Sequence, residues 1–120
     1  MTRGNDMSDF SQGFKGYELA EDIHGQIRLA KEKNINSLHL KNMNFNFACN
    51  YDDSQAKEVK KLLDKNGMNA LSLFIKNDVS PFRAEKLGAI YGVKYLVTDN
   101  EDKKRELEDN INDFIIVKED

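Results

Sequence analysis

The strongest constraint on the fold is a strand, helix, strand pattern in the second half of the chain. Two short apolar runs, 69–75 and 93–98, flank a segment in which apolar residues recur at helical spacing. Ser80 and Pro81 precede that segment, as an N-cap and a first-turn proline do, and Gly92 follows it as a left-handed C-cap does. This order predicts a βαβ unit, whose two strands are parallel.

The rest of the chain extends this unit on both sides. Helical spacing predicts helices over 17–33 and 52–65, and a short helix after Asn100. A final strand is predicted at 114–117. Residues 35–50 have two readings, a hairpin of strands 36–40 and 44–49 with an Asn-rich turn, or one bulged strand; the hairpin is favoured. The predicted fold class is α/β, a small three-layer sandwich with a four- to five-stranded, mostly parallel sheet and helices on both faces.

Composition bounds the size, the compartment and the partners. The 120 residues suit one domain, predicted at 17–120 after a flexible N-terminal leader at 1–16. A net charge of −3 disfavours general nucleic-acid binding, which calls for a basic excess. Cys49 is the single cysteine, so a reducing, cytoplasmic setting is expected. No apolar run approaches the roughly 20 residues that span a bilayer, so no membrane partner is expected.

Acidic and polar residues follow the predicted strands, where ligands bind in open parallel sheets. Asp78, Asp99 and Glu101 are the candidate metal ligands, because Mg²⁺ and Mn²⁺ prefer carboxylate oxygens. Such a metal would activate water against a phosphodiester. The other residues expected at this edge are Asp52, Asp53, Lys76, Asn77, Ser80, Thr98 and Asn100.

Helix capping explains most of the same residues without a ligand. Asp, Asn and Ser are the preferred N-caps, and each acidic group stands before a predicted helix. Capping is therefore the favoured interpretation, and the expectation is that no cofactor is present, with Mg²⁺ or Mn²⁺ as the alternative.

The segment from Asp78 to Glu101 also resembles the second half of a PIN-type nuclease domain. In that family an acidic residue precedes a helix, and the next strand ends in Thr-x-Asp or a close variant, the place of Thr98-Asp99-Asn100-Glu101 here. The resemblance covers about a fifth of the chain and implies a metal-dependent nuclease. The first acidic residue of the family has no counterpart, since Leu38-His39-Leu40 contains none, and the assignment is not carried over.

The sequence contains no GxGxxG, GxxxxGK[ST] or GxSxG motif and no complete catalytic set. The sequence therefore favours a small binding or regulatory protein that acts by protein–protein contact. Its expected partner is another protein, and a homodimer is one form that this contact can take. Met43 and Tyr51 are the candidate interface residues, whereas Phe45 and Phe47 are expected in the core. His24 and His39 are expected at the surface, and Cys49 is expected to be a half-buried structural residue.

Overall fold

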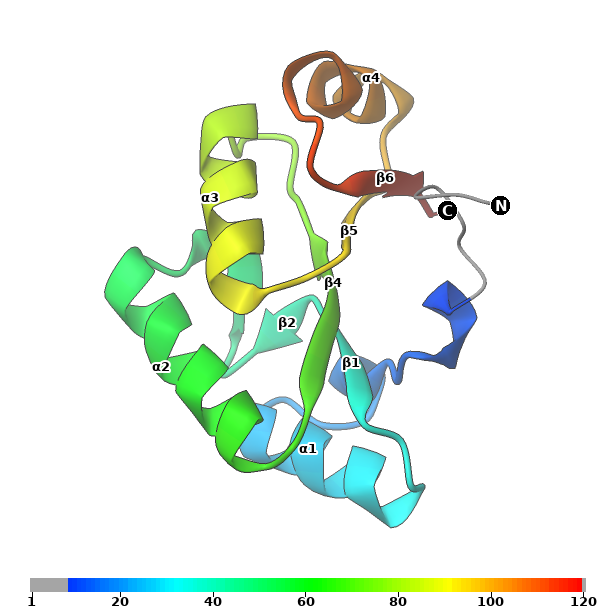
Figure 1. Cartoon of the computed structure of the whole chain (residues 1–120), viewed down its shortest axis with the longest axis vertical. Helices are drawn as coiled ribbons and strands as arrows, with labels where there is room; N and C mark the ends of the chain where they lie inside the picture. Colours follow the sequence, from blue (N-terminus) through cyan, green and yellow to red (C-terminus); the bar gives the residue numbers. More distant parts are fainter. Residues whose placement is uncertain (1–8, 120) are drawn as a thin grey trace.

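The computed structural model describes residues 9–119 and has a four-stranded parallel sheet at its centre (Figure 1). Its strands lie in the order β1-β4-β5-β6, and all three pairings are parallel. The predicted α/β class and the predicted parallel sheet are therefore confirmed. The strands are β1 (Ser37–Leu40), β4 (Asn69–Phe74), β5 (Tyr95–Thr98) and β6 (Ile115–Lys118).

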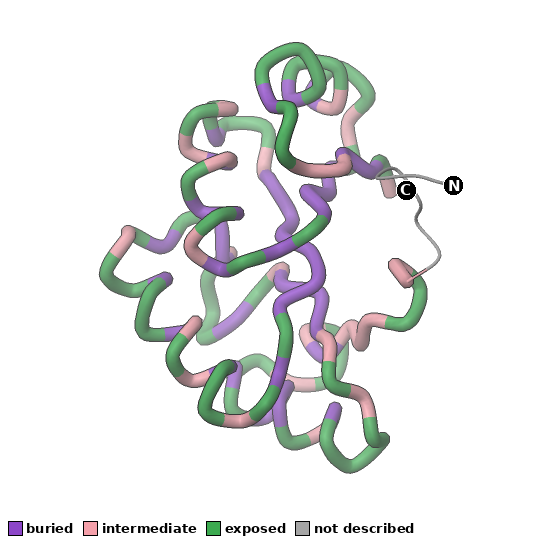
Figure 2. The backbone as a smooth tube through the Cα atoms, in the orientation of Figure 1, coloured by how far each residue is buried: buried purple, intermediate pink, exposed green. Residues whose placement is uncertain are grey.

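Four helices pack around this sheet, and three of them connect its neighbouring strands. Because the strands follow one another in chain order and such crossovers are right-handed, the three connecting helices lie on one face. The first helix packs into the same apolar cluster. Figure 2 shows that the central strands are buried along most of their length. The helices are α1 (Ile23–Glu32), α2 (Asp53–Lys65), α3 (Pro81–Tyr91) and α4 (Glu101–Asn110).

The predicted helix ends are largely correct, because local side chains fix them. Asp52 and Gln55 form a reciprocal capping box at the start of α2. Ser80 accepts a hydrogen bond from the amide of Arg83. Gly92 ends α3 with φ of 77°, in the left-handed region that glycine adopts without steric cost.

The first helix is shorter than the predicted 17–33. It begins at Ile23, because the Asp22 carboxylate accepts from the amide of Gly25 and sets the N-cap there. Residues Gly16–Glu18 form a separate 3₁₀ turn.

The predicted hairpin of 36–40 with 44–49 is wrong in its pairing. Residues 37–40 join the main sheet beside β4, and a shorter hairpin forms between β2 (Asn42–Met43) and β3 (Asn46–Phe47). The two-residue loop Asn44-Phe45 has positive φ at both positions, 55° and 66°, as in the type I′ turns that suit tight hairpins.

The face of the sheet opposite the connecting helices is covered in part by the segment 9–15, through Phe10. The Phe10 ring packs 4.6 Å from the His39 ring and 5.0 Å from the Tyr95 ring. Phe14 pairs with Leu38 in a parallel bridge that adds a single residue to the edge of the sheet. Residues 9–16 of the predicted leader thus contact the domain, and residues 1–8 lie outside the described part.

His39 joins this N-terminal segment to the sheet. Its Nε2 lies 2.9 Å from the carbonyl of Phe10, and its Nδ1 lies 2.6 Å from the hydroxyl of Ser72. A bulge in the pairing of β1 with β4 sets Ser72 opposite His39. Since only the ring can donate to a carbonyl, the neutral ring carries its proton on Nε2 and accepts from Ser72. The residue is 5% exposed, so the predicted surface position of His39 is wrong.

The burial of His39 predicts a pH-dependent stability. Burial lowers its pKa below 6.5, the value it regains on unfolding. Between the two pKa values the unfolded chain binds more protons, so the free energy of unfolding falls as pH drops below about 6.5 and levels off below the folded pKa.

The measurement is urea unfolding at several pH values between 7.5 and 5. We expect His39→Gln, which keeps one donor and one acceptor, to show a smaller fall in stability over this range than the wild type. His24→Gln, at an exposed position of α1, is the matched control and should behave as the wild type does. Equal pH dependence of the two variants would contradict the assignment.

Candidate functional site

A hollow of about 380 Å³ lies at the carboxyl ends of three neighbouring strands. Lys41 follows β1, Lys76 follows β4, and Asp99 follows β5. We call it the edge pocket, and its lining is Lys41, Phe47, Phe74, Lys76, Asn77, Asp78 and Asp99. The structure thus brings together four of the residues predicted at this edge, and adds one lysine and two phenylalanines that were not predicted there.

The remaining residues predicted at the edge do not line this pocket. Asp53 lies beside α3, where it accepts from Arg83 and pairs with Lys86 at 3.0 Å. The hydrogen bond from Arg83 is the main reason why the pKa of Asp53 lies below its usual value. Asp52 and Ser80 cap helices, as the capping interpretation expects.

Thr98 and Asn100 are also used by the fold. Thr98 is fully buried, and its hydroxyl lies 3.4 Å from the amide of Asn100. Asn100 caps α4 by accepting from the amide of Lys103. Asn100 borders a second, separate hollow, together with Asn77, Asp102, Lys103 and Glu106.

The predicted metal ligands do not gather into one group. Within residues 9–119, no three His, Cys, Asp or Glu side chains lie close enough to hold an ion, so Asp78, Asp99 and Glu101 do not make such a group. The strand order gives a physical reason why a metal site at this edge of the sheet would be weak. It runs in one direction without a reversal, whereas crevices for ligands in open α/β sheets occur where the order reverses.

Lysines and aromatic rings stack at the mouth of the edge pocket. The Phe47 and Phe74 rings lie 6.0 Å apart at an angle of 28°. Lys41 Nζ lies 4.6 Å from the centre of the Phe74 ring and 5.6 Å from that of Tyr17. Lys76 Nζ lies 5.1 Å from the Phe47 ring. Both ammonium groups are thus held by ring faces, an interaction of about 0.5–2 kcal/mol.

The interface predicted at Met43 and Tyr51 is wrong, because both residues are buried. Met43 is 0% exposed and Tyr51 is 8% exposed. The Tyr51 hydroxyl donates to the carbonyl of Met43 at 2.8 Å. Both residues therefore help to hold the β2–β3 hairpin on the domain.

The exposed apolar residue of this hairpin is Phe45, which was predicted in the core. Its side chain is 86% exposed at the loop, and its φ is 66°. A left-handed conformation costs a non-glycine residue about 1–2 kcal/mol, and type I′ loops favour glycine at this second position. The left-handed conformation of Phe45 therefore costs free energy of folding, and burial of its largely exposed side chain within the described chain does not offset that cost.

The hairpin that carries Phe45 is fixed from several directions. The amide of Asn44 donates to the carbonyl of Glu21 at 2.6 Å, and the amide of Ile23 donates to Oδ1 of Asn44 at 3.3 Å. Gln26 Nε2 donates to the carbonyl of Asn42 at 2.8 Å. These bonds tie the hairpin to α1 and to the turn before it, so the Phe45 ring is presented from a fixed backbone.

Other reactive groups are enclosed within the fold. Ser72 and His39 form a nucleophile–base pair by distance, but both are buried and the second ring nitrogen is held by Phe10. Cys49 is 2% exposed, and burial raises the pKa of its thiol. Cys49 is thus a buried thiol with weak nucleophilic character. None of the helices in residues 9–119 has the length and apolar character needed to cross a membrane.

Neither a protein-family model nor a curated protein sequence matches this chain.

The positive φ of Phe45 predicts an unusual mutational result. Phe45→Gly should be about 1 kcal/mol more stable than Phe45→Ala, because both lose the ring and glycine alone relieves the backbone strain. Urea unfolding of the two variants measures the difference. Equal stability would mean that position 45 is not held in the left-handed conformation.

Proposed function

We propose that the protein is a binding module that acts by protein–protein contact through the hairpin tip, residues 44–46. The observation that carries this proposal is the 86% exposure of Phe45 at a positive φ on a hairpin anchored by four hydrogen bonds. Exposing an aromatic side chain in this way adds nothing to folding, whereas an aromatic residue on a rigid element is the usual anchor of a protein interface.

The surroundings of Phe45 suit a partner protein. A shallow hollow beside the tip is lined by Tyr17, Glu21, Asn42, Asn46 and Phe47 together with Phe45 itself. Polar residues around a central aromatic are the arrangement that excludes water from a protein interface. The net charge of −3 argues against nucleic acid as the partner. A second copy of the chain is one partner with this chemistry, and the single buried thiol of Cys49 supports a cytoplasmic setting.

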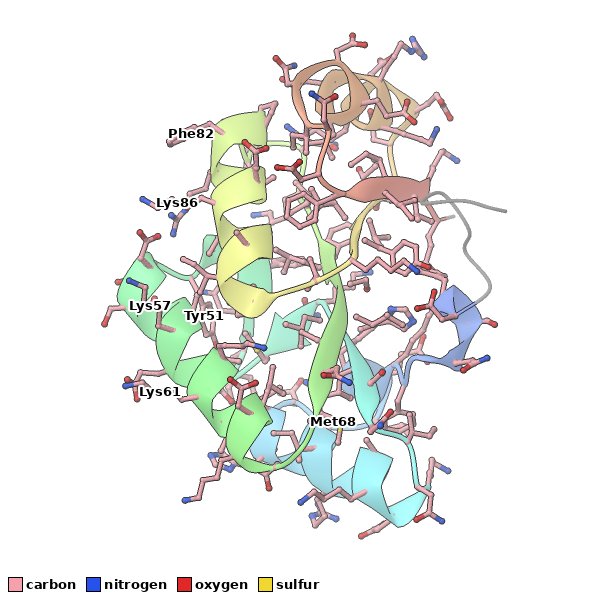
Figure 3. All side chains as sticks on the ribbon, viewed as in Figure 1. Tyr51, Lys57, Lys61, Met68, Phe82 and Lys86 are labelled. Carbon is pink, nitrogen blue, oxygen red and sulfur yellow. The ribbon has the colours of Figure 1, made fainter. Side chains whose placement is uncertain are left out.

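Affinity capture with three full-length baits tests the proposal. The baits are the wild type, Phe45→Gly and Phe82→Ala, each immobilised and exposed to an extract of the native host. Phe82 is the matched control, because it is 75% exposed and projects outward from the first turn of α3 (Figure 3). We expect at least one protein to be retained by the wild type and by Phe82→Ala, and to be reduced about tenfold or more on Phe45→Gly.

The captured protein is then purified and its affinity for the three baits is measured directly. Sedimentation of the wild type at rising concentration detects self-association, which Phe45→Gly should abolish if the partner is a second copy. Identical capture by all three baits, with no self-association of the wild type, would contradict the proposal.

A further inference from the structure

We infer that the edge pocket binds the carboxylate of a ligand with an apolar body, and that Lys41 and Lys76 hold this carboxylate. The site lies beside the hairpin tip but does not include Phe45. The inference is therefore independent of the proposed protein contact.

The surroundings of Lys41 are the first reason to expect an anionic ligand in the edge pocket. Lys41 is half-buried, and no acidic side chain of residues 9–119 lies within ion-pair distance of it. Its described side-chain contacts are the two ring faces, which hold the ammonium group but do not neutralise its charge. Long lysine side chains usually extend their charge into water. Here the charge is instead directed to the pocket, and its N–H donors remain available.

Lys76 supplies a second donor beside the first. It follows β4, the direct neighbour of β1, and neighbouring strands are about 4.8 Å apart. Lys76 is paired with Asp78 only loosely, at 3.8 Å, and the Asp78 side chain is 74% exposed. A carboxylate that enters between the two lysines can therefore accept charge-assisted hydrogen bonds from both.

The acidic residues select the charge of the ligand. Lys41 and Lys76 follow β1 and β4, and the pocket is also lined by two carboxylates, Asp78 after β4 and Asp99 after β5. Phosphate carries more charge than a carboxylate, and each added negative charge is repelled by Asp78 and Asp99. The Phe47 and Phe74 rings provide apolar surface for the rest of the ligand. A monocarboxylate with an apolar body fits all three features.

The test is an NMR titration of the full ¹⁵N-labelled chain with sodium phenylacetate at constant ionic strength. Phenylacetamide is the neutral control with the same shape. With phenylacetate we expect saturable shifts of the amides of Lys41, Phe47, Phe74 and Lys76. Phenylacetamide should bind with an affinity at least about tenfold lower. Equal shifts with both compounds, or shifts that do not saturate, would overturn the inference.

Two lysine variants make the test specific. Lys41→Met keeps an unbranched apolar side chain and removes the charge, so it should weaken phenylacetate binding at least about tenfold, whereas Lys41→Arg should retain binding. Lys57→Met is the matched control, because Lys57 is exposed, projects outward from α2 (Figure 3) and does not line the pocket. The spectrum of each variant shows whether it is folded. Loss of binding in Lys57→Met, or none in a folded Lys41→Met, would contradict the assignment.

A short peptide that ends in phenylalanine identifies the source of the carboxylate. If the free-acid peptide binds more tightly than phenylacetate and its amide does not bind, the ligand is a protein C-terminus. If phenylacetate binds more tightly than the peptide, the ligand is a small free acid. Tight binding of the amidated peptide would overturn the carboxylate site.

Discussion

The order of the strands is the constraint on which the rest of this structure depends. Strands that follow one another in chain order, joined by right-handed crossovers, place their connecting helices on one side. The other face of the sheet still carries Leu71, Tyr95, Val97 and Val117, which must be removed from water. Residues 9–15 cover it in part, with Phe10 between the rings of His39 and Tyr95. The hydrogen bonds of His39 to Phe10 and Ser72 hold this cover in place, and burial of the ring disfavours its charged form and lowers its pKa.

The same constraint places the two proposed binding surfaces at the rim of the sheet. In a strand order without a reversal, no crevice is expected between the helices, and the carboxylates that follow the strands cap a helix, pair with basic side chains or face solvent. What remains at the carboxyl ends is the edge pocket, and beside it the β2–β3 hairpin. Phe47 belongs to both, since its ring stacks on Phe74 and also borders the hollow next to Phe45.

Local rules predicted the parts of the fold that local side chains determine. The N-cap of Ser80, the first-turn Pro81 and the capping box of Asp52 with Gln55 need only residues three or four positions apart, and all three were predictable. The βαβ unit was predictable because its two apolar runs are flanked by turn residues.

The residues that sequence reasoning missed depend on contacts between distant parts of the chain. His39 is buried because Phe10, 29 positions away, covers it, and nothing near either residue indicates this contact. Lys41 reaches the pocket through the rings of Tyr17 and Phe74. The exposure of Phe45 had a local signal in the sequence. Asn44-Phe45 lies between two short alternating runs, as a two-residue hairpin loop does, and such a loop exposes its second residue.

In this account, the exposed Phe45 is held rigidly in an unfavourable backbone conformation, in which its ring is free to contact a partner. Backbone ¹⁵N relaxation of the free protein tests it without knowledge of that partner. We predict an order parameter of about 0.85 for the amides of residues 44–46, equal to that of the sheet, because hydrogen bonds to Glu21, Gln26 and Tyr51 fix the hairpin. An order parameter below about 0.6 would contradict the account, since the exposure of Phe45 would then be that of a flexible loop.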